Sequence, residues 1–337
     1  MLNRRKSARF FHPGLVAFVI AFLSLLFNAY TRLSDIGASC PDWPTCYEQL
    51  FMDKAAHAGD TLDYVGVPKN TELKRTLSRC LYGVLGLTLW WLVALAWKYR
   101  KRQRDRMVQP PLIVALLTFV PTVIWDLSVD IPFRPVMVMT QLLGGVLLLA
   151  MLWWIVLREV QFWRPVNVTA FTRSLRPHAV AALMLVAMQI ALGGWSVANY
   201  AGLACLDFPT CQGQWWPTMD FLGGFVPGHD VGQLVDGQSP DISAATAIHM
   251  AHRFGALITL LYLGWLSLHV LLRGTHENLC RYGMLILIIL SVEIILGVMQ
   301  MVAYPPLLLA VLHSGAAALL LLSVITLYHI TRPPQSA

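Results

Sequence analysis

The chain has 337 residues, of which 57% are hydrophobic and only 13% are charged. Soluble globular proteins carry about 25% charged residues, so this composition excludes a soluble domain and indicates an integral membrane protein. The formal net charge is +7, but the basic residues form short clusters between apolar runs and do not form one basic face. That distribution is typical of cytoplasmic loops and argues against a nucleic-acid partner.

Eight apolar runs follow one another along the chain. Each is close to the ~20 residues that a helix needs to cross the hydrocarbon core of a bilayer. The pattern predicts an all-α integral membrane protein with eight transmembrane helices. We expect these helices at about Pro13–Thr31, Leu73–Trp97, Pro110–Val129, Pro135–Leu157, His178–Tyr200, Ala245–Leu272, Tyr282–Ala303 and Pro305–Ile330.

The basic clusters predict how the helices are oriented. They lie before the first run, after the second, between the fourth and fifth, around the link from the sixth to the seventh, and after the eighth. All of these positions fall on one side, which the positive-inside rule makes cytoplasmic. Both termini are then cytoplasmic, and the long loops at about 33–72 and 201–244 are outside. We expect a multi-pass protein of a bacterial inner (plasma) membrane, surrounded by membrane lipid.

The two outer loops begin with related sequences. Residues 37–46 read GASCPDWPTC and residues 202–211 read GLACLDFPTC, each with five residues between two cysteines. An internal repeat of this kind indicates duplication. It predicts two pseudo-symmetric four-helix bundles, at 1–157 and 178–337, joined by a cytoplasmic linker at 158–177.

The four loop cysteines face an oxidising compartment in this orientation. We interpret them as two local disulfides, Cys40–Cys46 and Cys205–Cys211. A redox-active pair is the alternative for Cys40 and Cys46, and both interpretations stay open.

Two histidines lie inside predicted helices of the second half. His252 occurs in HMAHRFGA (249–256) and His313 in LAVLHSGAA (309–317). Both lie roughly 10–12 Å below the outer boundary at the helical rise per residue. Two imidazoles at one depth can bracket a haem as axial ligands. Two hydrogen-bonded interhelical histidines are the alternative.

Four neighbouring residues are further candidates for this site. Arg253 follows His252 and is placed to meet a haem propionate. His249 is one turn before His252 on the same face, where it could contact a propionate or support the ligands. Glu293, two turns before Gln300 on one face of the seventh predicted helix, could line the haem pocket or a proton path with it, and we expect a packing or pocket role for both.

Four stretches together resemble the haem A synthase family, and the resemblance spans nearly the whole chain. They are TRLSDIGASCPDWPTC (31–46), GGWSVANYAGLACLDFPTCQGQWWP (193–217), AIHMAHRFGAL (247–257) and VLHSG (311–315). The resemblance implies an eight-helix duplicated protein that oxidises a methyl group of haem O to a formyl group, giving haem A for cytochrome oxidases. It also implies that His252 and His313 hold a haem b in the C-terminal half.

The resemblance further implies the substrate, the product and the protein partners of the chain. These are haem O and haem A, and as protein partners haem O synthase and cytochrome c oxidase assembly factors. Association of the chain into a homo-oligomer is left open.

The first half departs from the family pattern, which places the substrate haem between two further histidines with a glutamate one turn before the first. TLSRCLYGVLGL (76–87) aligns with the first histidine helix, so that Ser78 occupies the histidine position and Arg75 the glutamate position. RPVMVMTQLLGG (134–145) places Gln141 at the second histidine position. Hydroxyl and amide groups are poor substitutes for the imidazole that usually holds haem iron.

Three interpretations follow from this departure. The chain could ligate substrate haem differently, through Met137, Met139 or His57. It could be a catalytically inactive homologue that binds only haem b and acts in oxidase assembly or electron transfer. It could also be a haem-handling assembly partner.

Overall fold

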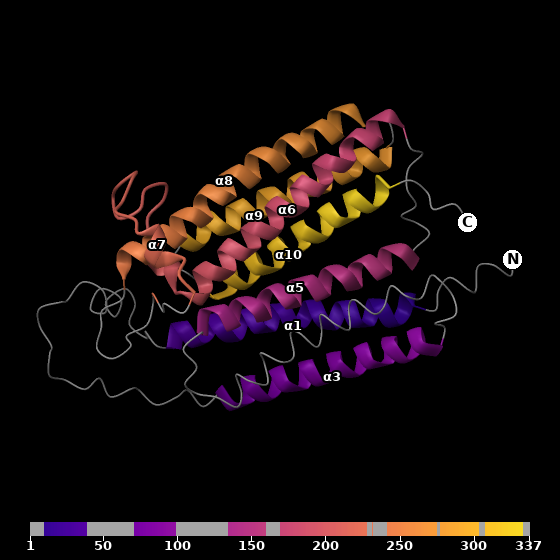
Figure 1. Ribbon diagram of the computed structural model, residues 1–337, viewed down its shortest axis with the longest axis horizontal. Helices are drawn as coiled ribbons and strands as arrows, with labels where there is room; N and C mark the ends of the chain where they lie inside the picture. Colours follow the sequence, from indigo (N-terminus) through magenta and orange to yellow (C-terminus); the bar gives the residue numbers. More distant parts are fainter. Residues whose placement is uncertain are drawn as a thin grey trace, which may run out of the picture.

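The computed structural model describes residues 10–38, 71–98, 134–159, 169–227, 231, 241–274, 277–302 and 307–332. Seven long helices run through these ranges (Figure 1). They are α1 (Phe11–Ala38), α3 (Thr71–Lys98), α5 (Arg134–Glu159), α6 (Ala170–Ala198), α8 (Ile242–Arg273), α9 (Glu277–Val302) and α10 (Leu307–Ile330). The loop between α6 and α8 carries two short elements, η3 (Ala201–Ala204) and α7 (Phe221–Gly224).

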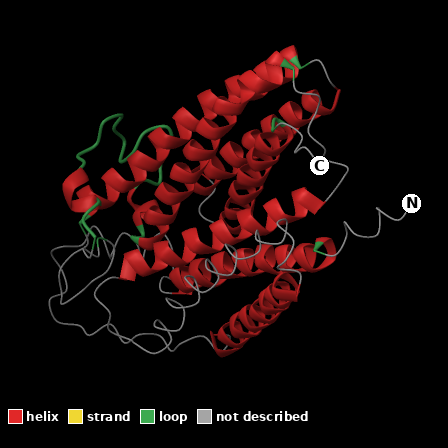
Figure 2. Ribbon diagram, turned by 45° about the vertical axis from the view of Figure 1, so that its right-hand side comes forward, coloured by secondary structure: helices red, strands yellow, loops and turns green. Residues whose placement is uncertain are grey.

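Within the described residues all named secondary structure is helical (Figure 2). All seven long helices have the length and apolar composition needed to cross a membrane. This confirms the all-α membrane class and seven of the eight predicted spans. The remaining predicted span, 110–129, lies outside the described residues, so eight helices and the pseudo-symmetry of the halves stay predictions.

The largest difference between a predicted and an observed helix start is at α6. α6 begins at Ala170, inside the stretch expected to be a linker, and not at His178. Thr169 caps it, because its side-chain oxygen accepts a hydrogen bond from the backbone amide of Thr172. Pro177 lies inside the helix. A proline ordinarily marks a helix boundary, and this is why the apolar pattern alone places the start too late.

The helices of the second half form a ring. α6 packs against α8 and α10, and α9 packs against the same two helices. α8 and α10 therefore face each other across the ring, and so do α6 and α9. In the first half α1 packs against both α3 and α5. The two halves meet where α1 and α5 pack against α10 and where α5 packs against α6 (Figure 1).

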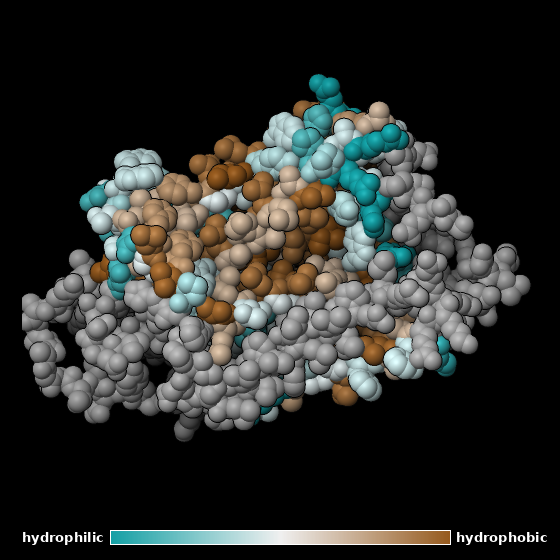
Figure 3. Space-filling view, viewed as in Figure 1, coloured by the Kyte–Doolittle hydropathy of each residue, from teal (hydrophilic) through white to brown (hydrophobic). Residues whose placement is uncertain are grey.

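The surface is apolar over the middle of the molecule and more polar towards its two ends (Figure 3). Large apolar side chains such as Leu257, Leu261 and Ile288 are more than half exposed. In a soluble protein such a patch would favour aggregation, but on a membrane-spanning bundle it is the face that meets lipid. The start of α1 and the end of α10 lie at one end of the bundle, and η3 and α7 lie at the other (Figure 1).

Candidate functional site

His252 projects from α8 against α6. Its Nδ1 lies 3.1 Å from the side-chain Nε2 of Gln189, which also donates to the His252 carbonyl oxygen at 3.0 Å. Gly193, on the same helix as Gln189, faces the ring: a Cβ built on it would lie 2.9 Å from His252 Cε1. Real Cβ atoms do not approach so closely, so α6 needs a glycine at this position for the imidazole to fit.

His313 has a matching environment on α10. Its Nδ1 lies 3.3 Å from Oε1 of Glu293 on α9, a distance suited to an ion pair, although the angle does not meet that of a hydrogen bond. A Cβ built on Gly297 would lie 3.2 Å from His313 Cε1. The two candidate ligands thus come from helices that face each other across the ring.

His249 is also buried, with 7% of its surface exposed. The backbone of Ala201 lies close, but neither ring nitrogen makes a hydrogen bond of acceptable geometry within the described part of the chain. A buried imidazole without partners is costly. His249 is therefore a candidate for contact with a bound group, as the sequence predicts, and that role stays a prediction.

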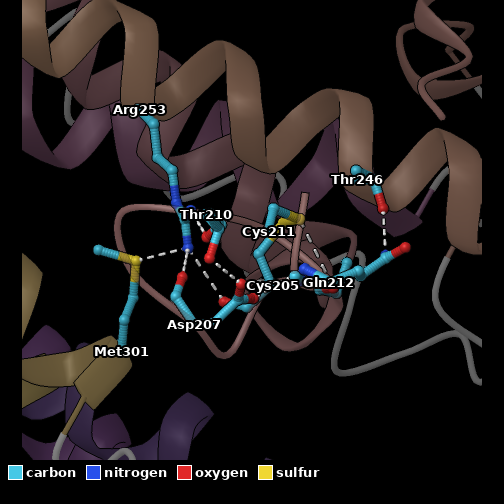
Figure 4. Close-up of a disulfide and its surroundings, with 10 residues drawn as sticks. Cys205, Asp207, Thr210, Cys211, Gln212, Thr246, Arg253 and Met301 are labelled. Carbon is cyan, nitrogen blue, oxygen red and sulfur yellow. Dashed lines mark hydrogen bonds between the residues drawn. A yellow bond between two sulfur atoms is a disulfide. The ribbon is translucent and has the colours of Figure 1, made fainter. Parts of the chain in front are cut away.

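Arg253 reaches into the loop that follows α6 (Figure 4). Its Nη1 donates to the carbonyl oxygen of Thr210 at 2.8 Å, and its Nη2 donates to those of Asp207 at 2.7 Å and Cys205 at 3.2 Å. Nη2 also lies 2.9 Å from Sδ of Met301. The predicted propionate contact stays a prediction. The contacts in the structure give Arg253 another role, which is to fasten the loop to the helix that carries His252.

The same loop is closed by a disulfide between Cys205 and Cys211, both fully buried (Figure 4). The structure agrees here with the predicted pairing. Cys40 and Cys46 lie outside the described residues, so their pairing and the redox-active alternative are not tested. Cys80 and Cys280 are free thiols.

Asp207 holds the loop together by hydrogen bonds to other residues of the same loop. Its carboxylate accepts hydrogen bonds from the Thr210 hydroxyl and from the backbone amides of Gln212 at 2.7 Å and Gly213 at 3.0 Å. Partial burial alone would raise the pKa of Asp207, but these hydrogen bonds together lower the pKa below its usual value. Gln212 continues the network by donating to Thr246 of α8 at 3.0 Å.

The first-half positions lie on two helices. Arg75 and Ser78 are on α3, and Gln141 is on α5. Ser78 and Gln141 are half-buried. Met139 packs towards the second half, because a Cβ on Gly194 of α6 would lie 2.9 Å from its Sδ. Met137 is on α5, His57 lies outside the described residues, and the ligand roles suggested for all three stay predictions.

The donor set fits a haem better than a bare metal ion. Within the described residues no cluster of three or more His, Cys, Asp or Glu side chains could hold an ion. Two opposed imidazoles match the two axial positions that a porphyrin leaves to the protein. A side chain of a neighbouring helix contacts Nδ1 of each ring, which leaves Nε2 as the nitrogen available to bind iron.

The fold and the site together define a multi-pass membrane protein with paired histidines inside a ring of four helices. Residues 14–325 match the family model for the cytochrome oxidase assembly protein. A heme A synthase of Shewanella oneidensis is 34% identical over 328 residues, with 93% of each chain covered. A heme A synthase of Mesorhizobium japonicum is 24% identical, covering 91% of this chain and 86% of that protein. The chain belongs to the haem A synthase family of cytochrome oxidase assembly proteins.

Proposed function

We propose that this chain holds a haem b between His252 and His313 and acts as a haem A synthase in cytochrome oxidase biogenesis. The observation that carries the proposal is the opposed pair of imidazoles, each backed by a glycine and each contacted at Nδ1 by a polar side chain. A haem held by two histidines is low-spin and transfers single electrons. His252 and His313 would bind it, and the ring of α6, α8, α9 and α10 would exclude water from it.

The proposed reaction is oxidation of one methyl group of haem O to a formyl group, giving haem A. Support comes from the name shared by the two relatives, heme A synthase, and from the coverage of nearly the whole chain by the Shewanella protein. The oxidation would take place in the first half, and the haem b of the second half would carry electrons.

A second function is favoured by Ser78 and Gln141, which stand where the family pattern has histidines. In this alternative the chain binds haem b in its second half without oxidising haem O, and serves oxidase assembly or electron transfer. A hydroxyl and an amide are weak ligands for haem iron, so a substrate haem would lack its usual axial support.

Expression in a host that lacks its own haem A synthase separates the two functions. If the first proposal holds, haem A appears in pigment extracted from the membranes, and the purified protein contains haem b. Haem b without haem A would support the second function and overturn the first. Purified protein without any haem, after expression with ample haem precursor, would overturn both.

We further propose that the chain resides in a bacterial inner membrane with both ends cytoplasmic. Haem O synthase and oxidase assembly factors are the proposed protein partners. Native gels would test whether the chain also associates with itself. Alkaline phosphatase fused after Gln212 should be active, because this loop would be outside. The same enzyme fused after Arg273 should be inactive, and the reverse pattern would overturn the orientation.

A further inference from the structure

α6 and α9 carry the same short pattern. Residues 189–193 read QIALG and residues 293–297 read EIILG. In both, a polar residue precedes a glycine by four positions, which places the two on one face of a helix. The helices α6 and α9 face each other across the ring, just as the histidine helices α8 and α10 do.

The residues of each pattern contact one imidazole. Gln189 contacts Nδ1 of His252 and Glu293 contacts Nδ1 of His313, at 3.1 and 3.3 Å. The glycine one turn later receives the Cε1 edge of the same ring in both cases. Each imidazole is therefore held on two sides by a single neighbouring helix. The same kind of contact, from a residue that does not touch the metal, commonly fixes the orientation of histidine ligands elsewhere.

The two supports differ in chemistry. A carboxylate can only accept hydrogen bonds, whereas an amide can donate through nitrogen or accept through oxygen. In the structure the amide nitrogen of Gln189 faces His252, and its Oε1 has no hydrogen-bond partner among the described residues. Rotation of this amide would present Oε1 to Nδ1. His252 is thus contacted by a neutral amide, which can either donate or accept a hydrogen bond. His313 is contacted by a carboxylate, which only accepts hydrogen bonds and can carry a negative charge.

We propose that Gln189 and Glu293 are positioning residues that make the two axial imidazoles unequal, with Glu293 setting the reduction potential of the haem between them. The inference rests on the proposed haem site. A carboxylate at Nδ1 makes His313 a stronger electron donor to iron, which favours the oxidised haem. An amide at the same position would remove that bias, since it has similar size but no charge.

The test is a redox titration of the low-spin haem in the purified full-length protein. Glu293→Gln should keep the spectrum and raise the midpoint potential. A change of about tenfold in the ratio of reduced to oxidised haem corresponds to about 59 mV for one electron. Glu293→Asp, which keeps the carboxylate, should stay closer to the unmodified protein. Gln189→Glu should lower the potential.

The control is Ser291→Ala, on the exposed face of the same helix, which should leave the potential unchanged. Haem lost in Glu293→Gln would overturn the expectation that the amide variant keeps the low-spin haem and changes only its potential. Equal potentials in the unmodified protein, Glu293→Gln and Gln189→Glu, all with intact low-spin spectra, would overturn the inference while leaving the haem site standing. An unmodified protein that binds no haem would instead overturn the proposed function.

Discussion

Gly193 and Gly297 each lie directly against the Cε1 edge of an imidazole. A Cβ at Gly193 would force the His252 ring to shift, and one at Gly297 would be unusually tight against His313, so both glycines leave room for an imidazole. Glycine inside a helix is intrinsically unfavourable. Its presence at these two positions is explained by close approach of neighbouring helices, which small residues permit in membranes.

Gly193→Ala should displace the His252 ring, because the new Cβ would lie 2.9 Å from Cε1. Overpacking of this kind costs about 1–3 kcal/mol. We expect a lower ratio of haem to protein, measured by pigment extraction, together with a lower unfolding temperature. Gly264→Ala, on α8 with open space around it, is the matched control and should leave the haem content unchanged.

His252→Ala and His313→Ala should each remove the low-spin haem spectrum, since one imidazole cannot supply both axial bonds. Absorption spectra of the purified variants measure this directly. Ser78→Ala on α3 should leave the spectrum unchanged. A low-spin spectrum that survives in both histidine variants would place the haem elsewhere in the chain.

At the scale of elements, the loop after α6 is part of the site and not merely a connection. Its carbonyl groups are gathered around the Arg253 guanidinium, and its turn is folded around the Asp207 carboxylate. Since Arg253 is the residue next to His252, the loop is fastened to the same turn of α8 that carries the candidate ligand. A planar fork of donors suits such a cluster of carbonyls, whereas an ammonium group would reach fewer of them.

Arg253→Lys should loosen this loop while keeping the charge. Hydrogen bonds from a charged donor contribute about 1.5–3 kcal/mol, and the variant would lose part of that contribution. We expect faster hydrogen exchange of the backbone amides of Gln212 and Gly213. Arg273→Lys, at the exposed far end of α8, should leave their exchange as it is. Unchanged exchange in both variants would contradict the fastening role.

Asp207 should make the loop sensitive to acid. Its pKa is lowered in the folded protein from the usual value of 3.8, so its stabilising contribution is complete above that value. The contribution is lost as the pH falls below 3.8 through the folded pKa. Chemical shifts of the Gln212 and Gly213 amides, followed against pH, should report this transition. Asp207→Asn should abolish it, and a transition that persists in this variant would assign the effect to another group.

On the scale of the whole molecule, the two halves meet along α5 and α10. Trp153 of α5 donates its indole N–H to the Thr326 hydroxyl of α10 at 2.9 Å. Gly315 of α10 packs closely against α1, because a Cβ built on it would lie 2.9 Å from Cδ2 of Leu26. Polar contacts and small residues are what membrane helices use to associate, because lipid provides no hydrophobic force to bring them together.

Trp153→Phe and Thr326→Val should therefore each lower the free energy of unfolding. The double variant should lose less than the sum of the two single losses, because both substitutions remove the same hydrogen bond. Interhelical hydrogen bonds in membranes contribute about 0.6 kcal/mol on average and about 1.7 at most. Unfolding in detergent measures the coupling energy through a double-mutant cycle. The control is Thr88→Val on α3, because the Thr88 hydroxyl bonds within its own helix. Its effect on the free energy of unfolding should add to that of Trp153→Phe.

Much of this protein is determined by local patterns in its sequence. Apolar runs of bilayer length predict the helices, because the cost of exposing charge or unpaired backbone to lipid leaves few alternatives. Seven of the predicted spans are helices in the structure. Cys205 and Cys211 could be paired from the sequence since they are close in the chain. His252 and His313 stood out because ionisable groups are rare within apolar helices.

The tertiary structure decided what surrounds those histidines. Gln189 meets His252 across 63 residues of chain, and Arg253 meets the loop carbonyls across 43 to 48. No periodicity within one helix encodes such contacts, because they depend on how neighbouring helices rotate and approach. Nor could the sequence show which glycines face an imidazole. The depth of His252 and His313 within apolar helices made them a candidate ligand pair from the sequence, whereas the glycines and polar side chains around them required the packing of four helices in a ring.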